Sequence, residues 1–128
     1  MQEDKLYEYA VIRVVPRVER EEFFNAGVIL YCRQLRFLKM KFTLDRRKLH
    51  ALCSNTEPHL IEEYLKGFEH ISNGEPNSGP IGKLDIASRF RWLTATRSTM
   101  VQTSKVHSGL CSDPEQTLDK LFRELVEC

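Results

Sequence analysis

The strongest constraint on the fold is a short run, GVILYC at residues 27–32, which carries no polar side chain between its glycine and its tyrosine. A strand with one solvated face alternates apolar and polar residues, so a strand that is apolar on both faces needs cover on both sides. The run is also far shorter than the roughly 20 residues that a membrane-spanning helix requires. The sequence therefore predicts a central strand here, in a sheet with other elements packed against it.

Three further segments are expected to complete the sheet. Residues 7–15, YEYAVIRVV, are rich in β-branched and aromatic side chains and stop at Pro16, which cannot donate to a sheet ladder. Residues 36–43, RFLKMKFT, alternate between apolar and basic side chains, as in a half-exposed strand. The short link before them predicts a hairpin with the central strand. A fourth strand is expected within residues 97–104.

Helix signals lie between and after these strands. Asp45 can cap a short helix over residues 46–53, and a second helix is expected to begin near Thr56, with Pro58 in its first turn. The last helix has Asp113 as its N-cap, followed by Pro114 and Gln116 in a capping-box-like start. We predict one α+β domain over residues 1–128, a mainly antiparallel sheet of about four strands with two or three helices packed on it.

Composition narrows the classes of protein to consider. The start, MQEDKLYEY, places acids where a secretory signal carries basic residues, so a cytoplasmic protein is expected. The four cysteines lie far apart, in no CxxC pair, and predict reduced thiols with neither a metal site nor a redox pair. The common catalytic motifs are absent as well. We expect no cofactor, and a non-enzymatic role is favoured over an enzymatic one.

The most unusual segment is RFRWLTATRSTMVQTSKVHSGLCS, at residues 89–112, which holds basic and hydroxyl side chains and no Asp or Glu. Within it Arg97, Ser98 and Thr99 suit an anion, because a guanidinium can make a two-pronged contact with phosphate or carboxylate. The alternative is an arginine held by backbone carbonyls. Gln102 would either line a groove or face water. His107, expected in a loop, could contact an anion or be structural.

Secondary candidates lie elsewhere in the chain. Arg13 stands in an apolar strand, where it must be exposed or paired with a carboxylate. Arg17 and Glu22 belong to a charge run that is either a solvated surface or a source of such pairs. Asn25 precedes the central strand in a turn or bulge. Arg89 opens the alternation RFRW, in which the aromatics either stack on bases or fill the core.

Nucleic-acid binding is a weaker possibility. Four basic residues gather on and before the third strand, but the net charge of the whole chain is only +1. A dedicated nucleic-acid domain is usually far more basic. The residues that would make such a surface are Arg33, Arg36, Lys39 and Lys41.

Two long segments carry a resemblance to a known family. YAVIRVVPRVEREEFFNAGVILYC near the start and RFRWLTATRSTMVQTSKVHSGLCSDPEQTLDKLF near the end resemble a family of small bacterial proteins known only as a domain of unknown function. The resemblance implies a compact cytosolic protein, commonly encoded beside a HipA-like kinase, and brings no catalytic residues with it. It favours an accessory or antitoxin-like binding partner of that kinase. The rival hypotheses are a small phosphoryl-ligand binder or enzyme and a nucleic-acid-binding module.

Overall fold

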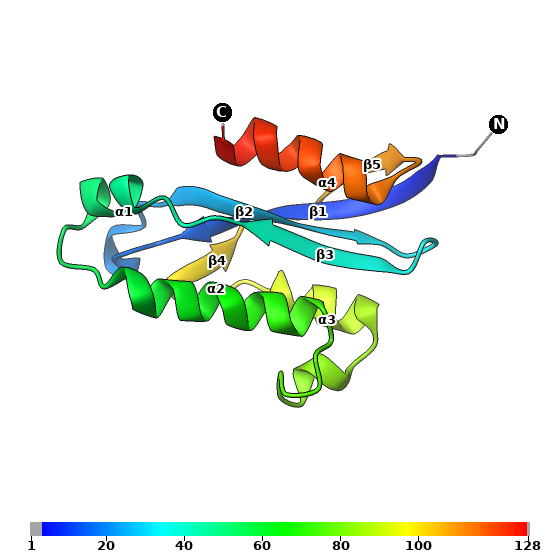
Figure 1. Ribbon diagram of the computed structural model, residues 1–128, viewed down its shortest axis with the longest axis horizontal. Helices are drawn as coiled ribbons and strands as arrows, with labels where there is room; N and C mark the ends of the chain where they lie inside the picture. The colour runs from blue at the N-terminus through cyan, green and yellow to red at the C-terminus, as the bar shows by residue number, and fades with distance from the viewer. Residues whose placement is uncertain (1–3, 128) are drawn as a thin grey trace.

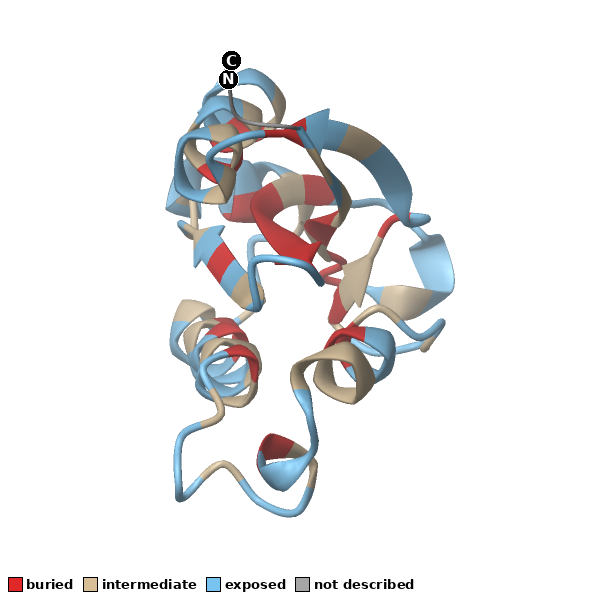
Figure 2. Cartoon of the chain, turned by 90° about the vertical axis from the view of Figure 1, so that its right-hand side faces the viewer, coloured by how far each residue is buried: buried red, intermediate tan, exposed pale blue. Residues whose placement is uncertain are grey.

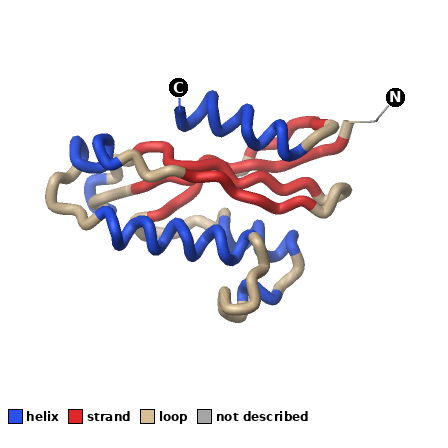
Figure 3. Tube along the Cα trace, viewed as in Figure 1, coloured by secondary structure: helices blue, strands red, loops and turns tan. Residues whose placement is uncertain are grey.

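The computed structural model describes residues 4–127 as a sheet between two helical layers (Figure 1). The C-terminal helix covers one face of the sheet, and two helices from the middle of the chain cover the other (Figure 3). Residues 27–32 lie in the strand that both layers cover. The predicted central strand is therefore confirmed, and so is the α+β class.

Within residues 4–127 the sheet has five strands, all paired antiparallel, where about four were expected. Their order is β3-β2-β1-β4, and β5 pairs with the other end of β1. The long strand β1 thus has β2 on one side and both short strands on the other. The strands are β1 (Lys5–Val14), β2 (Phe24–Cys32), β3 (Phe37–Phe42), β4 (Val101–Thr103) and β5 (His107–Cys111).

Strand β2 supplies side chains to two separate apolar cores. Ile29 is fully buried in the core beneath α2 (Pro58–Ser72) and α3 (Ile86–Leu93), and its neighbour Leu30 is fully buried in the core beneath α4 (Pro114–Phe122). Burying a large aliphatic side chain contributes roughly 1.5 to 3 kcal/mol. Strand β2 therefore contributes buried side chains beneath both helical layers, together with β1 and β3.

The helix boundaries follow the capping residues. Asp45 accepts hydrogen bonds from two backbone N–H groups at the start of α1 (Arg46–Leu52), and Asp113 does the same for α4, as predicted. Helix α4 continues through a wider turn, η3 (Arg123–Glu127), to the end of the described chain. Two single turns, η1 (Val18–Arg20) and η2 (Ile81–Lys83), complete the structure.

Three elements differ from the prediction. Helix α3, whose N-cap is Asp85, had not been expected; with it the described part of the chain has four α-helices instead of two or three. The expected strand at residues 97–104 shortens to β4, because the hydroxyl-rich residues before it form a turn. Residues 107–111, expected as a loop, form β5, because β1 extends well beyond β4 and its free edge takes a second partner.

Two remaining expectations concern thiols and membranes. Cys32, Cys53 and Cys111 are free thiols, as predicted, while Cys128 lies outside the described residues. Within residues 4–127, the helices are too short or too polar to cross a membrane.

Candidate functional site

The segment singled out by sequence lines a cleft between α2, α3 and the start of β4. The cleft has a volume of about 550 Å³. Helix α2 contributes Tyr64 and Phe68, and α3 contributes Trp92, so three aromatic rings face residues 97–101 across it. The cleft is therefore predominantly apolar, with one guanidinium and two hydroxyls at its border.

Arg97 is fixed in the wall of this cleft. Its Nη2 donates to the carbonyl oxygen of Trp92 and its Nε to that of Ala95, 3.4 Å away. The guanidinium carbon lies 4.5 Å from the ring centre of Trp92 and 5.0 Å from that of Phe68. Partial burial lowers the pKa of Arg97 from its ordinary value. Arg97 thus closes the C-terminal end of α3 and holds two aromatic rings in place.

The residues after Arg97 form a turn instead of the start of a strand. The hydroxyl of Thr99 donates to the carbonyl of Val101 at 2.8 Å, and the amide of Gln102 donates to the carbonyl of Thr99, also at 2.8 Å. Such local side-chain bonds compete with a sheet ladder. The prediction that Arg97, Ser98 and Thr99 begin a strand was therefore wrong, although all three do line one cleft.

Two aromatic rings of the cleft are unusually exposed. Tyr64 is 49% exposed and Trp92 is 38% exposed, whereas Phe90, two residues before Trp92, is fully buried. Phe90 is in the core as the sequence suggested, but Trp92 faces the cleft instead. Tyr64 and Phe68 were not among the candidate residues predicted from the sequence. The available signal was that a tyrosine on the apolar side of a helix keeps its polar end in water.

His107 lies apart from this cleft. It is an exposed residue of β5, and its ring centre is 5.4 Å from that of Tyr9 on the neighbouring strand. It is not among the residues lining the cleft. The structure therefore brings Arg97, Ser98 and Thr99 together in the cleft. Gln102 contacts Thr99 but does not line the cleft, and His107 lies elsewhere.

A second group of the expected residues forms a row across three strands. Arg13 of β1 lies opposite Asn25 of β2 and Gln102 of β4. Its guanidinium lies 4.2 Å above the ring of Phe23, and its Nε is buried without a partner among the described residues. The sequence predicted that Arg13 would be exposed or paired with a carboxylate; it is instead partly buried and stacked on an aromatic ring. Asn25 donates to the carbonyl of Leu125 at 3.0 Å.

The other secondary candidates make ordinary local contacts. Arg17 pairs with Glu19 at 2.7 Å and Glu22 pairs with Arg20 at 2.8 Å, both on the surface. Exposed pairs of this kind contribute about 0 to 1 kcal/mol. Arg89 donates to the carbonyl of Leu84 at 2.6 Å and so anchors the loop before α3.

The basic residues of β3 are matched by acids of α4. Lys39 pairs with Glu115 at 2.6 Å, and Lys41 pairs with Asp119 at 3.2 Å. A surface that recognises nucleic acid must offer its cations to phosphates. These two lysines are already engaged, so the contacts on β3 do not favour the nucleic-acid hypothesis.

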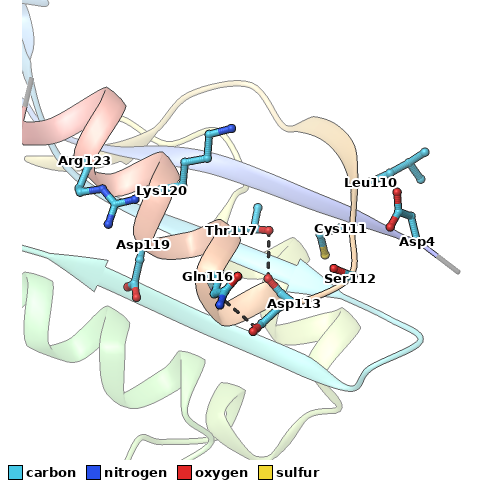
Figure 4. A pocket seen from close by; sticks show the side chains of 10 residues that line it. All are labelled: Asp4, Leu110, Cys111, Ser112, Asp113, Gln116, Thr117, Asp119, Lys120 and Arg123. Atoms are coloured by element: carbon cyan, nitrogen blue, oxygen red, sulfur yellow. Dashed lines mark hydrogen bonds between the residues drawn. The ribbon is translucent and has the colours of Figure 1, made fainter. Parts of the chain in front are cut away.

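A hollow of about 620 Å³ lies at the start of α4 (Figure 4). Its border mixes Asp4 and Asp113 with Lys120 and Arg123, and the carboxylate of Asp113 is occupied with the backbone of the helix. Burial raises the pKa of the Cys111 thiol in its wall, which makes a reactive thiolate less favourable. The mixed charges give this hollow no clear preference for an anion or a cation.

Comparison with known proteins places the chain in a family. A family model described as "Protein of unknown function (DUF3037)" matches residues 9–126. The chain belongs to the DUF3037 family. No curated protein and no solved structure matches it. Both the cleft and the row around Arg13 lie within the part of the chain that the DUF3037 model covers. Within residues 4–127, no three or more His, Cys, Asp or Glu side chains gather as metal ligands would.

Proposed function

We propose that this DUF3037 protein is a non-enzymatic interaction partner that receives an apolar side chain of another protein in the aromatic cleft. The observation that carries the proposal is the exposure of Tyr64 and Trp92 beside an arginine that is already fixed. A few residues usually carry most of the binding energy of a protein interface, and tyrosine, tryptophan and arginine are enriched among them. The cleft lining offers hydroxyl groups but no His, Cys, Asp, Glu or Lys side chain that could activate one as a nucleophile, so the lining favours binding over catalysis.

The cleft is also prepared for binding before a partner arrives. Arg97 holds the Trp92 ring from one side while its Nε and Nη2 donate to backbone carbonyls. Ordering a free side chain on binding costs about 0.5 to 1.5 kcal/mol, and much of that cost is avoided when the ring is already held. Removal of water from the apolar floor of the cleft then favours binding of an apolar side chain. The hydroxyls at the border can hydrogen-bond to the backbone of the partner and so fix its orientation.

The partner we propose is a HipA-like kinase in the cytosol, for which this protein acts as an accessory or antitoxin-like subunit. The support for this choice is the family resemblance of the two long sequence segments. The kinase would present a short aliphatic or aromatic side chain to the cleft.

Co-expression tests this proposal. Wild-type protein is expected to retain the kinase through affinity purification at physiological salt, and Trp92→Ala and Tyr64→Ala are expected to lose it. Leu35→Ala is the matched control, because Leu35 is 42% exposed in the hairpin turn and does not line the cleft. Failure of the wild type to retain the kinase contradicts the choice of partner. Equal retention by all variants contradicts the choice of site.

An anionic ligand is the second candidate, and the observation that favours it is the partly buried guanidinium of Arg13. A buried donor without a partner costs roughly 1 to 3 kcal/mol, and an oxyanion would remove that cost. The contacts favour this place over Arg97, whose Nε and Nη2 already donate to carbonyls. Inorganic phosphate at 100 times its dissociation constant should stabilise the wild type by about 2.7 kcal/mol. An equal thermal shift in Arg13→Gln would contradict the assignment.

A further inference from the structure

Strand β5 forms an open edge of the sheet. It pairs with β1 on one side, and among the described elements β1 is its only substantial neighbour. Figure 2 shows β5 at the outer margin of the molecule, largely exposed. Alternate residues of an edge strand direct their N–H and C=O groups outward, where another strand can pair with them.

The two edges of this sheet are protected very differently. At the opposite edge, β3 carries Lys39 and Lys41, and charged side chains are a common protection against pairing with other chains. Strand β5 reads HSGLC, with neither a proline nor an Asp, Glu, Lys or Arg. The edge formed by β5 is therefore the one open to a further strand.

An apolar patch lies beside this edge. Leu110 of β5 is 66% exposed, and Leu6, its partner on β1, is 59% exposed. They are the two most exposed of the large hydrophobic residues within residues 4–127. Both project from the face of the sheet opposite α4, since Tyr7 and Cys111, the residues after them, belong to the α4 side. An added strand would pair the edge and pack beside Leu110, the part of the patch nearest to it.

We propose that a second copy of this chain binds here, with two β5 strands pairing antiparallel about a twofold axis at Gly109. In that register Ser108 of each copy faces Leu110 of the other, and Lys105 faces Asp113. Lys105 and Asp113 are both exposed, so opposite charges meet at each end of the pairing and no like charges do. A homodimer interface must be self-complementary in this way. The result is one continuous sheet of ten strands.

Gly109 suits the centre of this register. A side chain on Gly109 would place its first carbon 2.6 Å from the hydroxyl of Tyr7, so the residue is small because Tyr7 lies across it. At the proposed axis Gly109 would face Gly109 of the second copy with no side chain between them. Leu110 is the exposed leucine nearest the added strand and Leu6 lies one strand further away, so we expect a weak, reversible dimer with a dissociation constant on the order of micromolar.

Sedimentation velocity of the full chain from about 5 to about 500 μM tests the proposal. The wild type is expected to shift from monomer to dimer with concentration. Leu110→Lys places a charge in the pairing and is expected to raise the dissociation constant at least tenfold, while Leu35→Lys, an equally drastic change in the hairpin turn, leaves it unchanged.

Two results would overturn the dimer. One is a wild type that stays monomeric over the whole range, which would leave the edge to some other partner or to none. The other is a Leu110→Lys variant that dimerises as well as the wild type, which would place the interface elsewhere. Ser108→Lys, on the same exposed strand, gives an independent reading if circular dichroism shows that Leu110→Lys is not folded.

Discussion

Two-sided burial of β2 leads to a quantitative prediction about neighbouring residues. Ile29 and Leu30 are adjacent, face opposite sides of the sheet and are both 0% exposed. Replacing either by alanine removes about three methyl or methylene groups, or roughly 2.4 kcal/mol of transfer free energy, before the cost of a cavity is added. Each variant should therefore lose about 2 to 5 kcal/mol of unfolding free energy.

Urea unfolding followed by circular dichroism measures this loss. For a slope of about 2 kcal/mol per molar, a loss of about 3 kcal/mol lowers the midpoint by about 1.5 M. In thermal unfolding, with an entropy of about 2.1 cal/mol/K per residue, the same loss lowers the melting temperature by roughly 11 °C for 128 residues. Both substitutions should produce shifts of this size.

Strand β3 supplies the comparison. It alternates between a buried and an exposed face, with Met40 2% exposed and Lys39 exposed. Met40→Ala should be costly, whereas Lys39→Ala should change the unfolding free energy by no more than about 1 kcal/mol, since its ion pair lies on the surface. If Leu30→Ala behaves like Lys39→Ala, then α4 does not cover β2 and the two-layer argument fails.

Three further predictions follow from local contacts. Asp113→Ala should lower the unfolding free energy by about 0.5 to 2 kcal/mol, because α4 loses its N-cap. Asp113→Ser should recover most of this loss in the same urea titration, since serine is also a good N-cap. Equal losses in the two variants would contradict a capping role. A hydrogen bond from a nearby threonine lowers the pKa of the Cys53 thiol, and burial raises the pKa of the Cys111 thiol. Mass spectrometry after alkylation at neutral pH should therefore find Cys53 modified before Cys32 and Cys111, and the reverse order would refute this. Hydrogen bonds from the first turn of α3 lower the pKa of Asp85, so the stabilisation from its carboxylate is present above about pH 4 and is lost as the pH falls through the lowered pKa. The free energy of unfolding should therefore fall less steeply with acid in Asp85→Asn than in the wild type. The same acid dependence in both proteins would argue against this.

The sequence predicted the central strand, its hairpin and the last helix because each has a strong local signal. The apolar side chains of GVILYC can all be buried only if both faces of the strand are covered, and Asp113 followed by Pro114 fixes the start of α4. Helix α3 was missed although Ile86, Phe90 and Leu93 follow helical spacing, because the basic and aromatic alternation of RFRW concealed it. The helical spacing was therefore present in the sequence, but the alternation of basic and aromatic residues was given more weight.

Other features had no local signal at all. Strand β5 contains five residues, and it forms because β1 extends past β4 and leaves an edge to pair. The row of Arg13, Asn25 and Gln102 joins residues far apart in the chain, through a register that only the folded sheet defines. The cleft likewise depends on how α2 and α3 meet, so Tyr64 and Trp92 could not be paired from sequence spacing.

The most direct test of the proposed function is the affinity of the purified HipA-like kinase for wild-type and Trp92→Ala protein, measured by biolayer interferometry at physiological salt. Truncation of an interface tryptophan costs at least about 2 kcal/mol, or roughly a thirtyfold rise in dissociation constant. We predict that rise for Trp92→Ala and none for Leu35→Ala. No binding by the wild type, or equal affinity of all three proteins, would contradict the account of the aromatic cleft as a docking site for that kinase.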